Sequence, residues 1–120
     1  MILGLDHVQL AMPEGRESEA RHFYCEILGM EEVSKPEELA GRGGAWFQSG
    51  GARLHLGIEA GFVPARKAHP ALIVENADVV RRRCEESGVE LSEAIEIPGH
   101  RRFYISDPFG NRLEITERIN

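Results

Sequence analysis

Cysteine is scarce in this sequence. Cys25 and Cys84 are its two cysteines, and no CxxC pair occurs. Neither a disulfide framework nor a zinc ribbon is therefore predicted. Both residues fall in amphipathic helical stretches, where a free cysteine behaves as a small apolar side chain and is expected to be buried. Low-complexity segments are also missing, so no disordered tail is indicated.

Long apolar runs are absent as well. No stretch reaches the roughly 18 apolar residues that a transmembrane helix needs, so no membrane span is predicted. Asp6 and His7 interrupt the apolar stretch near the N-terminus, which also has no basic leader. We therefore expect a cytoplasmic protein that does not associate with membranes.

Positive charge is in deficit. The sequence has 14 Lys and Arg against 20 Asp and Glu, a formal net charge of -6. Non-specific nucleic-acid binding needs an excess of basic residues to neutralise phosphates, so that class is disfavoured. The basic run at 81–83 is expected to be a solvated helix face. With 120 residues, 42% of them hydrophobic and 28% charged, the chain is typical of one globular domain.

What the sequence does contain is a repeat of itself. "LDHVQLAM" resembles "KAHPALIV", which places His7 opposite His69 at an offset of 69 - 7 = 62. Further along, an offset of 59 relates four pairs: Cys25 and Cys84, Gly29 and Gly88, Arg53 and Arg112, and Leu54 and Leu113. The same offset places His55 opposite Glu114, since 114 - 55 = 59. A longer first strand-to-helix loop, "PEGRES", explains the difference of three.

Periodicity predicts the same elements in both copies. Residues 3–11 alternate as a strand, and "ESEARHFYCEILGM" has apolar residues at helical spacing up to Gly29. The remaining predicted elements are strands near 30–35, 44–49 and 53–59, then a strand at 69–75, a helix at 77–87 ended by Gly88, and strands near 90–96, 100–106 and 112–118. The last two strands are joined by "DPFGN", whose composition is typical of a tight turn.

These elements predict an α+β fold of two βαβββ modules within a single domain. Module one covers 1–59, a linker covers 60–68 and module two covers 69–120. Each sheet is expected to carry its helix on one face, while the other face stays more polar. If the two sheets curve into a shared cup, these polar faces line it.

Strand parity assigns the chemically active side chains to the polar faces. The residues are His7, Gln9, His55, His69, His100, Arg102, Tyr104 and Glu114. The apolar residues between them fall on the helix-covered faces: Leu54, Leu56, Phe103, Ile105, Leu113 and Ile115. Three imidazoles and one carboxylate that converge suit a divalent Zn, Ni, Co, Mn or Fe ion and can leave positions open for water or substrate.

A structural alternative stands beside the metal hypothesis. A single histidine on a sheet is more often a hydrogen-bonded structural residue than a ligand. The repeat favours the metal, because His7 and His69 are equivalent positions, as are His55 and Glu114. His22, on the polar side of the first helix, has no such support and is expected to be solvated. His100 is either a substrate or second-sphere contact or simply a residue at the start of a strand.

The duplicated modules, with "LDHVQLAM", "AHPALIV" and "FYISDPFGNRLEITE", resemble the vicinal oxygen chelate superfamily over nearly the whole chain. This superfamily groups glyoxalase I, methylmalonyl-CoA epimerase, extradiol dioxygenases, fosfomycin resistance enzymes and bleomycin-binding proteins. The resemblance implies metal ligands on the first and last strands of each module, here His7, His55, His69 and Glu114. His55 stands where glyoxalase I has a glutamate and the epimerase a glutamine, which leaves Glu114, or His55 itself, to act as the base.

Other members of the superfamily match in part. His7, His69 and Glu114 resemble the iron ligands of extradiol dioxygenases, and Tyr104 matches a tyrosine of their sites. A fourth ligand at His55 would, however, occupy a position that oxygen and catechol need. Fosfomycin thiol transferases share these residues but usually have a threonine where Gln9 stands. Bleomycin-binding proteins keep the fold without the metal, so four intact ligands disfavour that class.

The sequence therefore predicts a metal-dependent, glyoxalase-like lyase or isomerase that acts on a small oxygen-rich substrate. A divalent metal would chelate two neighbouring substrate oxygens while Glu114 moves a proton. Tyr104 is either a hydrogen-bond donor to the substrate or a buried structural residue. Gln9, His100 and Arg102 are predicted substrate contacts, although Arg102 has the alternative of a solvated charge at a strand end.

Two further expectations concern function and assembly. The alternative from another class is a protein that binds and sequesters a small molecule without turnover, and a dioxygenase or thiol transferase is a third possibility. The resemblance also implies a homodimer, in which module one of one subunit pairs with module two of the other, so that each site is shared.

Overall fold

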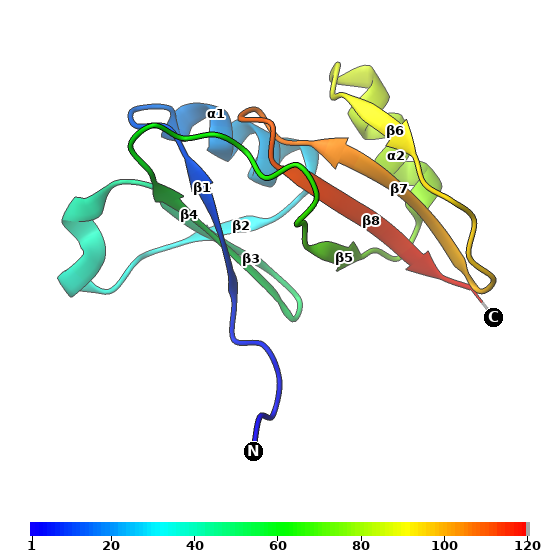
Figure 1. The fold of residues 1–120 in the computed structure, drawn as a ribbon, viewed down its shortest axis with the longest axis horizontal. Coiled ribbons are helices and arrows are strands. Elements are labelled where there is room, and N and C mark those ends of the chain that lie inside the picture. Colours follow the sequence, from blue (N-terminus) through cyan, green and yellow to red (C-terminus); the bar gives the residue numbers. More distant parts are fainter. Residues whose placement is uncertain (120) are drawn as a thin grey trace. The chain divides into compact units, whose positions relative to one another are not determined.

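The computed structural model describes residues 1–119, which fall into two compact units, one of residues 1–63 and one that begins at Pro64. The first unit follows the order strand, helix, three strands (Figure 1). Its elements are β1 (Val8–Met12), α1 (Glu17–Arg21), the π-helix η1 (His22–Ile27), β2 (Glu31–Val33), the 3-10 helix η2 (Glu37–Arg42), β3 (Ala45–Ser49) and β4 (Ala52–Ile58).

The second unit repeats the same order. Its elements are β5 (Ala71–Ile73), α2 (Ala77–Glu86), β6 (Leu91–Glu93), β7 (His100–Ser106) and β8 (Arg112–Arg118). The predicted α+β fold of two βαβββ modules is thus confirmed. None of the helices described for residues 1–119 is long and apolar enough to cross a membrane.

The two sheets have matching topology. Their strand orders are β1-β4-β3-β2 and β5-β8-β7-β6, with one parallel pair in each, β1 with β4 and β5 with β8. Gln9 lies opposite His55 in the first sheet, and Ala71 lies opposite Glu114 in the second. His7 and His69, each two residues earlier, therefore hold equivalent positions, as the offsets predict.

Each sheet buries the face that its helix covers. In the first unit the Tyr24 ring of η1 stacks on Phe47 of β3 at a centroid distance of 5.1 Å. In the second, the Arg81 guanidinium of α2 lies 4.7 Å from the Phe103 ring centroid. The six apolar strand residues predicted for these faces are all buried: Leu54, Leu56, Phe103, Ile105, Leu113 and Ile115. The predicted site residues therefore lie on the opposite face of each sheet, away from its helix.

Some predicted boundaries are wrong. Strand β1 begins at Val8 and β5 at Ala71, so His7 and His69 precede the strands on which they were predicted. The first helix changes to π geometry at His22, where the Leu28 N–H donates to the carbonyl of Phe23, five residues earlier. This wider turn buries three large side chains, those of Phe23, Tyr24 and Ile27.

The 3-10 helix η2 was not predicted. Its sequence, "EELAGR", shows no apolar periodicity, and none of its residues is buried. Both cysteines are free, as predicted. Cys84 is buried, whereas Cys25 is only half-buried, and burial raises the pKa of both thiols.

Candidate functional site

In the first unit, His55 is held between two aromatic rings. It lies in the middle of β4, where the Trp46 indole of β3 stacks on it at 3.8 Å with an interplanar angle of 4°. The His7 ring stacks at 4.0 Å and 17°. His55 is consequently only 7% exposed although it belongs to the face away from the helix. This sandwich fixes the orientation of its imidazole.

Burial also sets the protonation of His55. Desolvation lowers the pKa of His55 below its ordinary value of 6.5, and the neighbouring His7 lowers it further, while Asp6 acts in the opposite sense. A lowered pKa keeps the imidazole neutral into mildly acidic conditions. His55 therefore keeps a nitrogen lone pair available for a metal ion at neutral pH.

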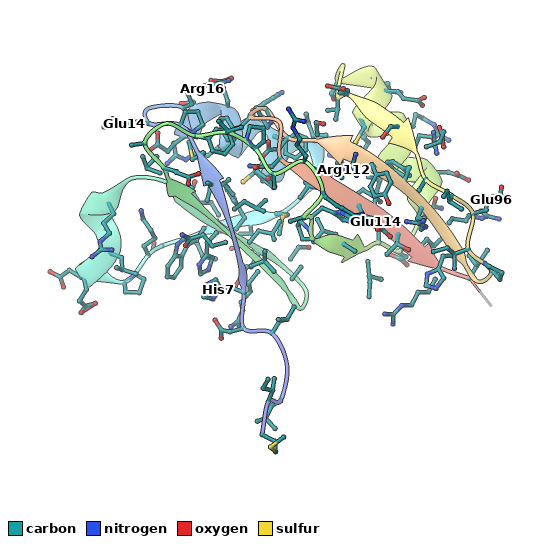
Figure 2. All side chains as sticks on the ribbon, viewed as in Figure 1. His7, Glu14, Arg16, Glu96, Arg112 and Glu114 are labelled. Atoms are coloured by element: carbon teal, nitrogen blue, oxygen red, sulfur yellow. The ribbon has the colours of Figure 1, made fainter. Side chains whose placement is uncertain are left out.

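His7 lies just before β1 (Figure 2). Its neighbour Asp6 orients the imidazole. The His7 Nδ1 lies 2.9 Å from the Asp6 carboxylate, and this hydrogen bond lowers the pKa of Asp6. Because a carboxylate accepts, Nδ1 carries the proton and the lone pair of the neutral ring is on Nε2. A carboxylate behind an imidazole is the usual arrangement behind metal-binding histidines.

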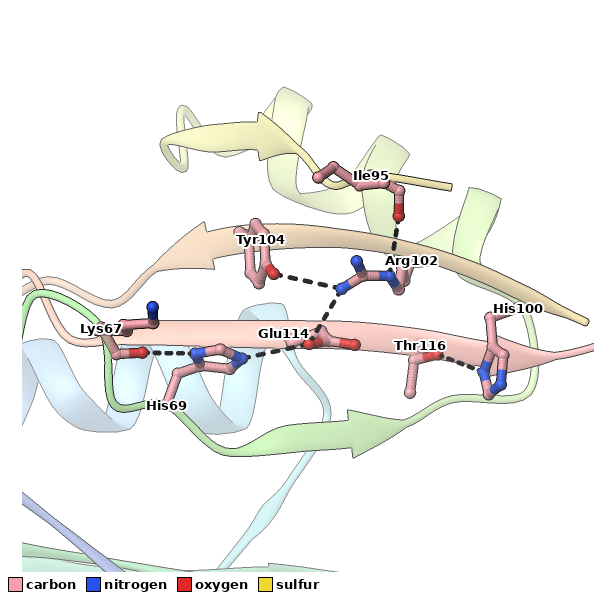
Figure 3. A network of polar contacts seen from close by, with 8 residues as sticks. All are labelled: Lys67, His69, Ile95, His100, Arg102, Tyr104, Glu114 and Thr116. Carbon is pink, nitrogen blue, oxygen red and sulfur yellow. Dashed lines mark hydrogen bonds and ion pairs between the residues drawn. The ribbon is translucent and has the colours of Figure 1, made fainter. Parts of the chain in front are cut away.

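The second unit orients His69 in the same way (Figure 3). The His69 Nδ1 donates to the Lys67 carbonyl over 2.8 Å, since a carbonyl can only accept. Its Nε2 faces the Oε1 of Glu114 at 3.2 Å. A neutral His69 and an ionised Glu114 would turn two lone pairs toward each other. A shared proton or a cation between the two atoms resolves this conflict.

Arg102 is occupied by contacts within the second unit. Its guanidinium lies 3.3 Å from the Glu114 carboxylate and donates to the Tyr104 hydroxyl at 3.2 Å and to the Ile95 carbonyl at 3.1 Å (Figure 3). With its side chain only 12% exposed, Arg102 is not a solvated strand-end charge. The Arg112 guanidinium covers the Tyr104 ring at 4.8 Å, so Tyr104 is held on two sides.

The other two predicted substrate contacts lie on the same polar faces. Gln9 lies across Gly57, where an added Cβ would come within 2.7 Å of the Gln9 amide nitrogen. Glycine at this position therefore gives Gln9 its room beside His55. His100 is exposed at the start of β7, and its Nδ1 is 3.5 Å from the Thr116 hydroxyl, apart from the His69–Glu114 pair (Figure 3).

The donor atoms of each unit suit a divalent metal, although each unit supplies only two of them. Among residues 1–119 no group of three His, Cys, Asp or Glu side chains is arranged as a metal site. The 3.2 Å between His69 Nε2 and Glu114 Oε1 matches two ligands that each lie about 2.1 Å from one ion. The rings of His7 and His55 are nearly parallel, so their in-plane lone pairs converge only after His7, whose side chain is 40% exposed, rotates.

Family comparison agrees with this fold. The family model described as Glyoxalase/Bleomycin resistance protein/Dioxygenase superfamily matches residues 4–115, so the chain belongs to this superfamily. The resemblance to the vicinal oxygen chelate superfamily is thereby confirmed. No curated protein gave a match.

Solved structures extend the comparison. A protein assigned to the glyoxalase family from Bacillus anthracis is 49% identical, with a TM-score of 0.93, and the match covers 98% of this chain and 97% of that one. The fosfomycin resistance protein FosX from Listeria monocytogenes is 22% identical over 96% and 91% of the two chains, with a TM-score of 0.75. A glyoxalase/dioxygenase from Nostoc punctiforme is 22% identical over 100% and 98%, with a TM-score of 0.76. At these lower identities the likeness concerns the fold alone.

Sequence reasoning missed the residues that orient the histidines. Trp46 pairs with His55 across the first sheet, as Tyr104 pairs with Glu114 across the second. Because His55 and Glu114 are equivalent positions in the repeat, pairing the strands would have identified Trp46 as the counterpart of Tyr104. Asp6 directly precedes His7, a signal that was present in the sequence. The Lys67 carbonyl could not be identified from the sequence, because any residue at that position supplies a backbone carbonyl.

Proposed function

We propose that the protein is a metal-dependent, glyoxalase-like lyase or isomerase, in which His7, His55, His69 and Glu114 hold one divalent metal. The observation that carries the proposal is the His69–Glu114 pair. The Lys67 carbonyl fixes the His69 tautomer so that its Nε2 lone pair meets a carboxylate oxygen at 3.2 Å. A cation between these two atoms satisfies both lone pairs. In the other unit, Asp6 orients the His7 ring in the same way.

The metal, when bound, acts as a Lewis acid that polarises two neighbouring oxygens of the substrate. Glu114 is the proposed base, because its carboxylate lies on the open face and has a second oxygen, Oε2, to accept a proton while Oε1 meets His69 and Arg102. Arg102 fixes the position of this carboxylate and also donates to the Tyr104 hydroxyl. The Tyr104 hydroxyl keeps its own hydrogen to donate to a substrate oxygen.

We further propose that the protein is a homodimer whose sites each combine residues of both subunits. Two observations support this proposal. Each unit supplies only one pair of the four proposed ligands. The apolar side chains of Met1, Ile2, Leu3 and Leu5 are also at least 86% exposed, which is unusual for consecutive apolar residues and favours a covered surface.

Total metal analysis of purified protein, followed by reconstitution with Zn²⁺, Ni²⁺, Co²⁺, Mn²⁺ and Fe²⁺, tests the proposal. We expect one metal ion per chain and loss of metal in His69→Ala and Glu114→Gln variants that remain folded. His22→Ala is the matched control, since this exposed histidine lies outside the site. Protein that stays metal-free in every reconstitution would contradict the proposal and favour small-molecule sequestration.

A further inference from the structure

A cavity opens beside His55 within the first unit. It has a volume of about 420 Å³, within the range of small-molecule sites. Gln9 and Trp46, the two cross-strand partners of His55, both line it, together with Gly57. The cavity therefore adjoins both cross-strand partners of a proposed metal ligand, and Leu39 and Arg42 of η2 also line it.

The charge of this cavity is opposite to that of the chain. Its two ionisable lining residues are Lys35 and Arg42, both cationic, whereas the chain as a whole carries a formal charge of -6. Arg42 has no ion-pair partner among residues 1–119. Lys35 donates to the Gly43 carbonyl and lies close enough to Glu17 to lower the pKa of that carboxyl. Arg42 is thus the uncompensated cation.

The backbone holds Arg42 at the cavity. Arg42 is the last residue of η2, and the chain then passes through Gly43 and Gly44, both with positive φ. The Gly44 N–H donates to the Glu17 carboxylate over 3.0 Å, which ties the end of η2 to α1. A Cβ on Gly44 would lie 2.0 Å from the Leu56 carbonyl oxygen, so the segment packs directly on β4.

We infer that this cavity binds an oxyanion of the substrate, so that the substrate class is a small organic acid with a carboxylate or a phosphate-type group. The inference rests on the proposed function, since it places the anionic end of that same substrate. The Arg42 guanidinium suits both oxyanions because it can donate two parallel hydrogen bonds, and Lys35 adds a point charge. The Trp46 indole and the Leu39 side chain face the apolar part of the substrate. The Gln9 amide forms a hydrogen bond to the substrate between its oxyanion and its metal-bound end.

Trp46 provides a direct readout, because it is the single tryptophan of the chain. Metal-free protein is titrated with benzoate, phenylphosphonate and neutral benzamide while Trp46 emission is recorded. We expect both anions to change the Trp46 emission. The anion that binds more tightly identifies the oxyanion that the cavity prefers. Benzamide should bind at least ~10-fold more weakly, and salt should weaken the anions because it screens charge.

Variants separate the cation from general surface charge. Arg42→Gln should weaken anion binding about tenfold, the typical effect of one lost charge-assisted hydrogen bond, and Arg42→Lys should recover part of it. Arg82→Gln, which removes the same charge from an exposed position on α2, should leave the affinity unchanged. Equal binding of benzamide, or no effect of Arg42→Gln, would overturn the inference.

A parallel Zn²⁺ titration keeps the two hypotheses apart. Zn²⁺ binding at His55 should alter Trp46 emission through the stacked rings, in Arg42→Gln as well as in the parent. Metal binding without anion binding would overturn the inference alone. Anion binding without metal binding would contradict the proposed function, and the cavity would remain an organic-acid site.

Discussion

At the scale of single residues, His55 decides how many ligands the proposed metal site has. His55→Ala removes an imidazole from the polar face and not from the helix-packed core, so we expect weaker metal binding in a folded protein. Isothermal titration of parent and variant with Zn²⁺ and Ni²⁺ measures the difference, which should reach at least ~100-fold for a lost ligand, as even outer-shell partners cost 10–100-fold. Indistinguishable affinities would reduce the site to His7, His69 and Glu114.

Tyr104 is a second test at this scale. Tyr104→Phe removes the hydroxyl that accepts from Arg102 and would donate to the substrate, but it keeps the ring under Arg112. Turnover should fall about tenfold at unchanged metal content, in line with one lost hydrogen bond. Steady-state kinetics, metal analysis and thermal melting are compared on the same preparation. Parallel losses of stability and activity would instead assign Tyr104 a structural role.

Single residues were predictable where the repeat constrained them. The pairs His7 with His69 and His55 with Glu114 follow from sequence offsets, and the strand register reproduces them. Arg102 was less predictable, because its partners Ile95 and Glu114 are seven and twelve residues away and depend on how β7 pairs with its neighbours. The stack of Trp46 on His55 required the same strand register.

At the scale of elements, the glycine pair after η2 should be sensitive to substitution. Gly44→Ala forces a side chain into a position with φ 77° and only 2.0 Å from a backbone oxygen. We expect a loss of about 2–4 kcal/mol in the free energy of unfolding, from strain and overpacking together. Gly61→Ala is the control, since its φ is also positive but nothing lies within 4 Å, and it should lose only about 1 kcal/mol. Urea denaturation compares the two, and equal losses would contradict the packing argument.

The tie between α1 and η2 should depend on pH. The Gly44 N–H lowers the pKa of Glu17 below its ordinary value of 4.5. Its folded pKa is depressed, so Glu17 contributes stability that is present above pH 4.5 and is lost as the pH falls below it. Glu17→Gln should therefore flatten the fall in stability between about pH 5 and pH 3.

Denaturation midpoints of parent and variant across this range measure the effect. Glu38→Gln removes the same charge from an exposed residue of η2 and should leave the slope as in the parent. If Glu17→Gln keeps the parent slope too, the hydrogen bond to Gly44 does not set the titration.

Elements were predictable in type but not in their ends. Apolar periodicity located the four strands and the helix of each module because tertiary packing uses that same periodicity. It extended β1 and β5 too far, since parity continues through His7 and His69 although no neighbouring strand pairs with them. The helix η2 was not predicted, because its conformation follows from Pro36 at its start and the glycines at its end. It has no buried face that would produce an apolar pattern in the sequence.

At the scale of the whole molecule, mixed dimers test whether sites are shared. His55→Ala and His69→Ala chains each lack one ligand and should bind metal weakly. If each site combines one unit from each subunit, a mixed dimer regains one intact site, so refolding both chains together should restore roughly a quarter of the tight sites. Metal content after co-refolding measures this, with separately refolded chains as the control. No restoration would contradict shared sites, and a monomeric mass by light scattering would exclude the dimer.

The two cysteines limit the chemistry of the whole chain. Burial raises the pKa of both thiols, so very little reactive thiolate is present at neutral pH, and Cys84 has no solvent-exposed surface. A thiol-transfer reaction on this scaffold would therefore have to draw its sulfur from a separate cosubstrate. Cys84 should also resist alkylating reagents while the protein stays folded, so labelling of this thiol measures unfolding.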